Sequence, residues 1–72
     1  MQPYANLGGG SNVVGYEIGV DWIRVLFGDG SIYRYTYQSA GASNIEHMKQ
    51  LAAAGQGLNS FIMRVVKYRY AR

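Results

Sequence analysis

Hydrophobic and polar residues alternate along the first half of the chain and recur every three to four positions along the second half. The alternation is clearest over residues 22–27 and 31–37, and residues 12–18 carry a weaker version rich in β-branched side chains. Such alternation predicts β-strands, and the Gly28-Asp29-Gly30 turn predicts a hairpin between the two clearest ones. We therefore expect three antiparallel strands in meander order.

The length of the hairpin loop decides which side chains share a face of the sheet, because a one-residue slip inverts every side chain. A three-residue loop, with Gly30 in the left-handed position, places Val25 opposite Tyr33. The residues that then share the face covered by helices are Ile23, Val25, Phe27, Tyr33, Tyr35 and Tyr37. The opposite face carries Trp22, Arg24, Leu26, Ile32, Arg34 and Thr36.

A two-residue loop at Asp29-Gly30 gives the other register. The residues that then share one face are Trp22, Arg24, Leu26, Tyr33, Tyr35 and Tyr37. Three tyrosines and an arginine on one face form a stacking platform like those of sheet-type RNA binders, although tyrosine is also a usual core residue. We favour the three-residue loop, because it keeps both Arg24 and Arg34 out of the apolar layer.

The chain after Ser43 follows a helical period. Ser43 and Glu46 have the spacing of a capping box, which predicts that a helix begins there. One apolar stripe follows, made of Ile45, Met48, Leu51 and Ala52. Gly55 suits the left-handed residue after a last turn, so the spacing predicts a helix over residues 44–54.

A second helix is predicted after the Gly55-Gln56-Gly57 break, with Asn59 as its N-cap. Its apolar stripe consists of Phe61, Ile62, Val65 and Val66. Continuing the same period would bury the charge of Arg69, so we expect the helix to end near Tyr68 and residues 69–72 to form an exposed tail.

These elements predict an α+β fold, a three-stranded antiparallel β-meander followed by two helices packed on one face. Residues 1–10 end in a glycine run, which we expect to be a flexible leader without contacts to the rest of the chain. Residues 11–72 then form a single domain. With 72 residues, no cysteine and 49% hydrophobic residues, the chain must rely on one compact core, which excludes a large enzyme cleft.

Positive charge is concentrated in the C-terminal part of the chain. Residues 1–46 carry a net charge of −2, whereas residues 47–72 carry +5. This asymmetry suggests a polyanion-binding end, although a solvated basic helix face gives the same count. The candidate nucleic-acid contacts are Arg64, Lys67, Arg69, Arg72, Arg34 and Arg24. The candidate aromatic contacts are Trp22, Tyr33 and Tyr35.

Residue types that carry catalysis are scarce. His47 is the one imidazole, and neighbouring helix positions point about 100° apart, so it forms no dyad with Glu46. Cysteine is absent and the acids lack metal-site spacing. We expect no enzymatic activity, no metal and no cofactor. No apolar run approaches ~18 residues and the N-terminus lacks the features of a signal peptide, so we expect no membrane association and a cytoplasmic location.

Residues at fixed spacing in three segments form a pattern, and the resemblance that it carries covers about residues 11–70. The segments are Ile23-x-Val25-x-Phe27-x-x-Gly30-x-x-Tyr33-x-Tyr35, then Gly55-x-x-Leu58-Asn59-x-x-Ile62, and finally Tyr68-x-Tyr70. The pattern resembles the KTSC domain, a family named for its occurrence at the C-terminus of some lysyl-tRNA synthetases and also found as stand-alone small bacterial proteins. Its hallmark Tyr-x-Tyr is matched by Tyr33-Arg34-Tyr35.

The resemblance implies a short β-meander with helices and a function that is not established, with RNA binding suggested by the synthetase context. Family members tend to have a Val-Pro pair after the tyrosines, where this chain has Gln38-Ser39-Ala40-Gly41-Ala42. They also tend to have an aromatic residue where Leu58 stands.

Two classes of function follow from these observations. The first is a small non-catalytic module that binds RNA through the basic C-terminal helix and tail. The second is a protein-interaction or self-associating module, which uses an apolar patch of Trp22, Leu26 and Ile32 on the outer sheet face. The expected partners are thus RNA or another protein, and the chain itself is expected to be a monomer or a weak homodimer.

Overall fold

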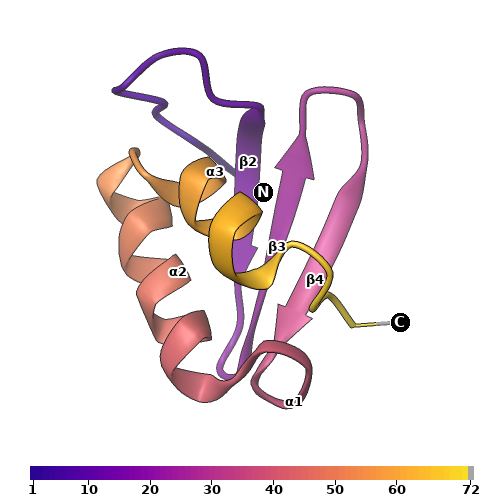
Figure 1. The fold of residues 1–72 in the computed structure, drawn as a ribbon. Helices are drawn as coiled ribbons and strands as arrows, with labels where there is room; N and C mark the ends of the chain where they lie inside the picture. The colour runs from indigo at the N-terminus through magenta and orange to yellow at the C-terminus, as the bar shows by residue number, and fades with distance from the viewer. Residues whose placement is uncertain (72) are drawn as a thin grey trace.

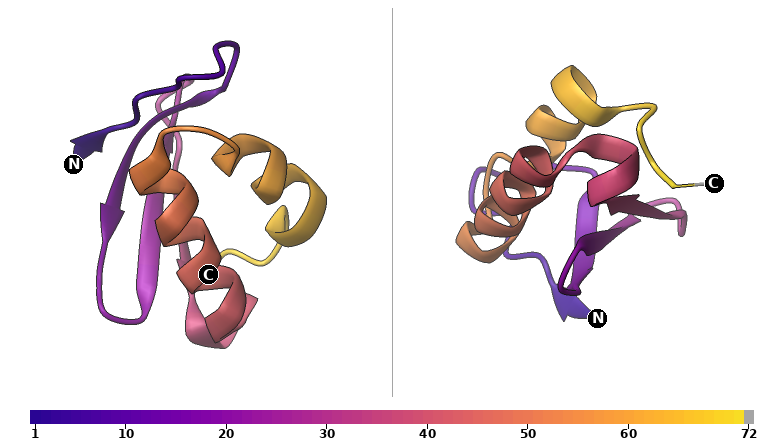
Figure 2. Two further views of the ribbon diagram at one scale, coloured as in Figure 1. Left: turned by 90° about the vertical axis from the view of Figure 1, so that its left-hand side faces the viewer. Right: turned by 90° about the horizontal axis from the view of Figure 1, so that it is seen from below.

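The computed structural model describes residues 1–71. Its sheet has four antiparallel strands in the order β1-β2-β3-β4, and the helices cover one face of it (Figures 1 and 2). The strands are β1 (Gln2–Pro3), β2 (Val13–Ile18), β3 (Trp22–Phe27) and β4 (Ile32–Thr36). The helices are α1 (Tyr37–Ala40), α2 (Ala42–Ala54), α3 (Leu58–Phe61) and the π-helix η1 (Ile62–Val66). The predicted α+β class is confirmed, with four strands in place of three.

Residues 2–7 pack on the domain, whereas the glycines at positions 8–10 are exposed. Strand β1 pairs with β2, with Gln2 opposite Tyr16, and the side chain of Tyr4 belongs to the core. The N–H of Leu7 donates to the carbonyl of Gly55 at 2.7 Å. The expected leader without contacts is therefore wrong, because burial of a tyrosine ring and hydrogen bonds to distant segments offset the chain entropy of the glycine run.

The hairpin between β3 and β4 has the predicted three-residue loop. Val25 lies opposite Tyr33, and the N–H of Phe27 donates to the carbonyl of Ser31 at 2.8 Å. Gly30 has a φ of +90°, in the left-handed region that glycine adopts at low cost. The register that keeps the arginines off the covered face is thus confirmed.

Four of the six side chains expected under the helices are buried, namely Ile23, Val25, Phe27 and Tyr35. The other two, Tyr33 and Tyr37, are 38% and 37% exposed. Tyr37 no longer belongs to the strand, because it is the first residue of α1. Tyr33 lies on β4, the last strand of the sheet, where its ring contacts Phe27 and Tyr70.

One continuous core lies between the sheet and the helices. Its members are Tyr4, Val13, Ile23, Val25, Phe27, Tyr35, Ala40, Ile45, Met48, Ala52, Leu58, Ile62 and Val66. Helix α2 contributes three residues of its predicted stripe, while Leu51 is only partly buried. The helix ends as predicted at Gly55, whose φ is +76°.

The predicted start of α2 is wrong. The helix begins at Ala42, its N-cap is Gly41, and no side chain caps it. The carboxylate of Glu46 instead lies 2.8 Å from the ammonium of Lys49 and accepts a hydrogen bond from the Tyr37 hydroxyl at 2.5 Å. These two donors, the ammonium first, lower the pKa of Glu46.

The capping box lies at the N-terminus of α1, the short helix that precedes α2. The N–H of Ser39 donates to Oγ1 of Thr36, and the N–H of Thr36 donates to Oγ of Ser39, both at 3.0 Å. Thr36 is the last residue of β4 and has a φ of −123°. The sheet thus supplies the extended conformation that an N-cap needs, and residues 37–40 are helical where a loop was expected.

Replacing Thr36 or Ser39 with alanine should lower the free energy of unfolding by about 0.5–2 kcal/mol. Thr36→Ala removes the acceptor of the Ser39 N–H, and Ser39→Ala removes the acceptor of the Thr36 N–H. Ser43→Ala is the matched control and should change it by less than about 0.5 kcal/mol. Urea denaturation of the three variants measures the difference. A larger effect of Ser43→Ala would place the cap where the sequence alone suggested it.

The second helical segment begins one residue before the expected N-cap. Its first residue is Leu58 and its N-cap is Gly57, not Asn59. The buried side chains are Leu58, Ile62 and Val66, each four residues apart, a spacing that the widened turn of η1 keeps on one face. The helix ends at Val66, two residues earlier than expected.

Candidate nucleic-acid interface

The segment that follows η1, residues 67–71, lies against β4. The N–H of Ala71 donates to the carbonyl of Arg34 at 2.6 Å. The ring of Tyr70 lies 4.9 Å from that of Tyr33, with the planes 47° apart. Tyr70 and Ala71 are half-buried, so the expectation of a wholly exposed tail holds for Arg69 and is wrong for residues 70–71.

A groove of about 240 Å³ opens between segment 67–71 and the β3–β4 hairpin. Its lining residues are Asn12, Phe27, Asp29, Ser31, Tyr33, Tyr35, Met63, Lys67, Tyr68 and Tyr70. Phe27 meets Tyr33 edge-to-face, with ring centres 5.7 Å apart. Half of the lining residues are aromatic, so the groove offers several ring faces and edges to a flat ligand.

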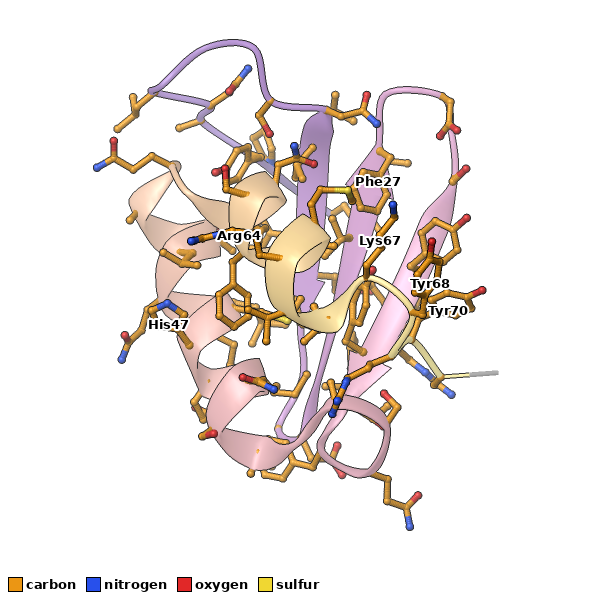
Figure 3. All side chains as sticks on the ribbon, in the orientation of Figure 1. Phe27, His47, Arg64, Lys67, Tyr68 and Tyr70 are labelled. Carbon is orange, nitrogen blue, oxygen red and sulfur yellow. The ribbon has the colours of Figure 1, made fainter. Side chains whose placement is uncertain are left out.

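Lys67 brings a positive charge to this groove (Figure 3). Its ammonium lies 5.4 Å from the centre of the Tyr68 ring, within the range of a cation–π interaction. The Tyr68 side chain is 72% exposed. A solvent-facing ring and an ammonium thus stand side by side, and Arg69 follows them as an exposed residue.

A negative charge lines the groove at the tip of the hairpin. Oδ1 of Asp29 accepts a hydrogen bond from the N–H of Ser31 at 2.9 Å. The backbone N–H of Ser31, followed by its hydroxyl, lowers the pKa of Asp29. Asp29 is therefore ionised at neutral pH. The groove thus has a carboxylate, from Asp29, and an ammonium, from Lys67, among its lining groups.

Tyr35 reaches the groove from the core. The residue is 1% exposed, so the prediction that it offers a stacking surface is wrong. Burial raises the pKa of Tyr35 to about 12, with smaller contributions from Tyr33 and Tyr70. Its hydroxyl stays protonated at neutral pH, and of the two tyrosines on β4 only Tyr33 has a partly exposed ring.

The outer face of the sheet carries the remaining predicted strand residues. Nε of Arg24 lies 3.4 Å from Oε1 of Glu17, and its guanidinium lies 5.4 Å from the Trp22 ring. Trp22 also packs on Gly19, where an added Cβ would overlap the indole. Arg34 lies opposite Arg24 in the strand pair. Trp22, Arg24 and Arg34 therefore lie on the other face of the sheet from the groove.

The other predicted cations do not meet at the groove. Arg64 lies across η1 from Lys67 and Tyr68 (Figure 3), and its Nε donates to the carbonyl of Ser60 at 3.4 Å. Arg72 lies outside the described residues. Of the six predicted cations, the structure thus brings Lys67 into the groove, and Arg69 is exposed two residues further along the chain.

Several groove residues were missed as functional candidates, among them Phe27, Asp29, Tyr68 and Tyr70. One sequence feature includes Tyr68 and Tyr70, since Tyr-Arg-Tyr occurs twice, at residues 33–35 and 68–70. Packing of segment 67–71 on β4 places one tyrosine of each copy in contact. The repeat by itself gives no indication of that contact, which depends on where the last helix turns back.

A second depression lies along β1 and β2. Its volume is about 470 Å³, and it is lined by Met1, Gln2, Tyr16, Glu17 and Ile18. Its one charged side chain is the acid Glu17, so it suits a polyanion less well than the groove at Lys67 does.

Two further observations on residues 1–71 concern metal binding and membrane-spanning helices. In that range no three His, Cys, Asp or Glu side chains lie close enough together to hold a metal ion. His47 packs edge-to-face on Phe61, with ring centres 4.8 Å apart. No helix in the described part of the chain has the length and apolarity needed to cross a membrane.

None of the family models, curated proteins or solved structures compared with the chain matches it. The geometry and chemistry of the groove are therefore what bear on function.

Proposed function

We propose that this chain is a non-catalytic, cytoplasmic module that binds single-stranded RNA in the groove between segment 67–71 and the β3–β4 hairpin. The observation that carries the proposal is the exposed ring of Tyr68 with the ammonium of Lys67 5.4 Å from its centre. A base stacks on an aromatic face and a cation contacts the adjoining phosphate in many single-strand binders. The resemblance to the KTSC domain supports the same function, and we propose membership of that family with it.

The groove favours a single strand over a duplex. Its volume of about 240 Å³ is below the roughly 300–1,000 Å³ of pockets for drug-sized ligands, so one unstacked base suits it. Bases in a duplex are stacked on each other and offer no free face to Tyr33 or Tyr68. Lys67 and Arg69, both exposed, would contact phosphates on either side of the bound base.

Binding of a short oligouridine should weaken as salt rises, with a slope of log affinity against log salt of roughly −2 for about three phosphate contacts. Lys67→Ala should reduce the magnitude of that slope by about 0.7, because one counterion fewer is released. Fluorescence anisotropy of a labelled RNA at several salt concentrations measures both slopes.

Arg64→Ala is the matched control, because it removes the same charge from the far side of η1 (Figure 3). It should leave the slope near that of the unsubstituted chain. Equal slopes for Lys67→Ala and Arg64→Ala would place the RNA outside the groove.

Absence of binding at low salt would overturn the proposal and favour a protein contact on the outer sheet face. On that face Ile32 is 52% exposed and lies opposite Leu26. An apolar contact of this kind persists at high salt, because apolar burial does not depend on counterion release.

A further inference from the structure

The groove is lined by groups of different chemistry from two segments. Asp29 and Ser31 line its hairpin end together with Asn12, whereas Lys67, Tyr68 and Tyr70 line it from segment 67–71. Asn12 is held against the hairpin, since its carbonyl accepts a hydrogen bond from the N–H of Gly28 at 2.8 Å. A ligand that fills the groove therefore meets polar side chains from the hairpin and an ammonium from segment 67–71.

Asp29 dominates the hairpin end as a hydrogen-bond acceptor. Asp29 is exposed, and the groups that hydrogen-bond to its carboxylate within residues 1–71 are the N–H and hydroxyl of Ser31 and its own backbone N–H. An ionised carboxylate has about four lone-pair sites on two oxygens, so bonds to Ser31 leave acceptor capacity. This end of the groove therefore favours a ligand edge that presents adjacent N–H donors.

Guanine is the RNA base whose pairing edge presents two adjacent donors, the ring N1–H and the exocyclic amino group. A carboxylate accepts both in a two-point contact, which is stronger and more specific than a single hydrogen bond. Adenine and cytosine present one amino group beside an acceptor nitrogen, and that nitrogen would face the negative charge of Asp29. Uracil presents one N–H between two carbonyls.

We propose that the groove selects guanine in single-stranded RNA, with Asp29 accepting from the pairing edge and Lys67 contacting a neighbouring phosphate. This inference rests on the proposed function and adds the identity of the base. The charges of the lining residues support it, because Asp29 supplies an acceptor for the N–H groups of a base and Lys67 supplies a cation for a phosphate. The base itself lies among Tyr33, Tyr68 and Tyr70, whose rings cover its faces.

The test uses the full chain and four labelled oligouridines that differ at the central position, with guanosine, inosine, adenosine or uridine there. The guanosine RNA should bind about tenfold more tightly than the adenosine RNA. Inosine lacks the exocyclic amino group but keeps N1–H, so its RNA should bind with intermediate affinity. Fluorescence anisotropy at one low salt concentration gives the four affinities.

Asp29→Asn is the decisive variant. The asparagine Oδ1 can still accept from the N–H of Ser31, so the turn is kept, but one acceptor oxygen becomes a donor. The preference for guanosine over adenosine should fall to about twofold or less, while binding of the uridine RNA is kept. Asp21→Asn makes the same charge change in the turn between β2 and β3, away from the groove, and should leave the preference intact.

Each outcome distinguishes the inference from the function on which it rests. Salt-dependent binding with equal affinity for guanosine and adenosine overturns guanine selection and leaves RNA binding standing. A preference that survives Asp29→Asn also overturns the assigned contact. If none of the four RNAs binds, both proposals fail, and a proline-rich peptide titrated against the same tyrosines tests whether the groove serves a protein partner.

Discussion

Replacing Tyr4 with alanine should lower the free energy of unfolding by about 3–5 kcal/mol, as for other large aromatic residues removed from a core. Tyr4 is 7% exposed, and its own N–H donates to the carbonyl of Val14 at 3.1 Å. Its hydroxyl accepts a hydrogen bond from the N–H of Leu58 at 3.2 Å. Chemical denaturation followed by circular dichroism measures the loss.

Tyr4→Phe separates the ring from the hydroxyl. It keeps most of the packing but leaves the buried N–H of Leu58 without that acceptor, which should cost about 1–3 kcal/mol. Tyr68→Ala is the control, because that ring is 72% exposed and its loss should change the stability by less than about 0.5 kcal/mol. Equal effects of Tyr4→Ala and Tyr68→Ala would show that the first residues do not pack on the domain.

Gly55→Ala should lower the free energy of unfolding by about 2–5 kcal/mol, from two separate causes. A φ of +76° costs an L-residue about 1–2 kcal/mol. The added Cβ would also lie 2.6 Å from Cβ of Ala5, and overpacking of this kind costs about 1–3 kcal/mol. Thermal or urea denaturation of the variant gives the sum.

Two further variants separate those causes. Gly30 has a φ of +90°, and a Cβ added there would meet no neighbouring atom within 4 Å. Gly30→Ala should therefore lower the free energy of unfolding by the backbone cost alone. Ala5→Gly added to Gly55→Ala removes the steric overlap and should recover the difference. If Gly55→Ala and Gly30→Ala are equally destabilising, the segment around Ala5 does not contact the end of α2.

The sequence predicts the centre of the fold better than its ends. The three-residue hairpin loop follows from two local facts, the placement of Gly30 and the high cost of burying Arg24 or Arg34. The end of α2 at Gly55 is likewise local. Strand β1 is not, because Tyr4 bonds to Leu58, 54 positions along the chain, and a glycine run between β1 and β2 gives no sign of that contact.

The start of the helical region shows two similar local patterns in competition. Two residue pairs have the spacing of a capping box, Thr36 with Ser39 and Ser43 with Glu46. The capping box forms at the first pair, because β4 holds Thr36 in the extended conformation of an N-cap. Glu46 has stronger partners in Lys49 and Tyr37. Capping spacing alone cannot rank the two, since the deciding contacts come from the strand before Thr36, from Tyr37 on α1 and from Lys49 one turn along α2.

The candidate site was predictable in its parts but not as a whole. The cluster of basic residues near Lys67 follows from the charge count, and the end of the helix close to Tyr68 follows from the end of the apolar stripe. The groove itself depends on the turn after Val66, which returns the chain to Arg34 on β4. Helix η1 separates Lys67 from Arg64 (Figure 3), although a simple count of charges treats the two as equivalent.

The hydrogen bond from Ala71 to Arg34 has a consequence for the solubility of the folded chain. Open sheet edges are where β-proteins add further strands and grow into aggregates. At one edge of this sheet, β1 is two residues long and includes Pro3, which has no N–H to offer an incoming strand. At the other edge, segment 67–71 occupies a carbonyl of β4. Both borders are thus poor templates for edge-to-edge polymerisation, even though the outer face of the sheet is uncovered.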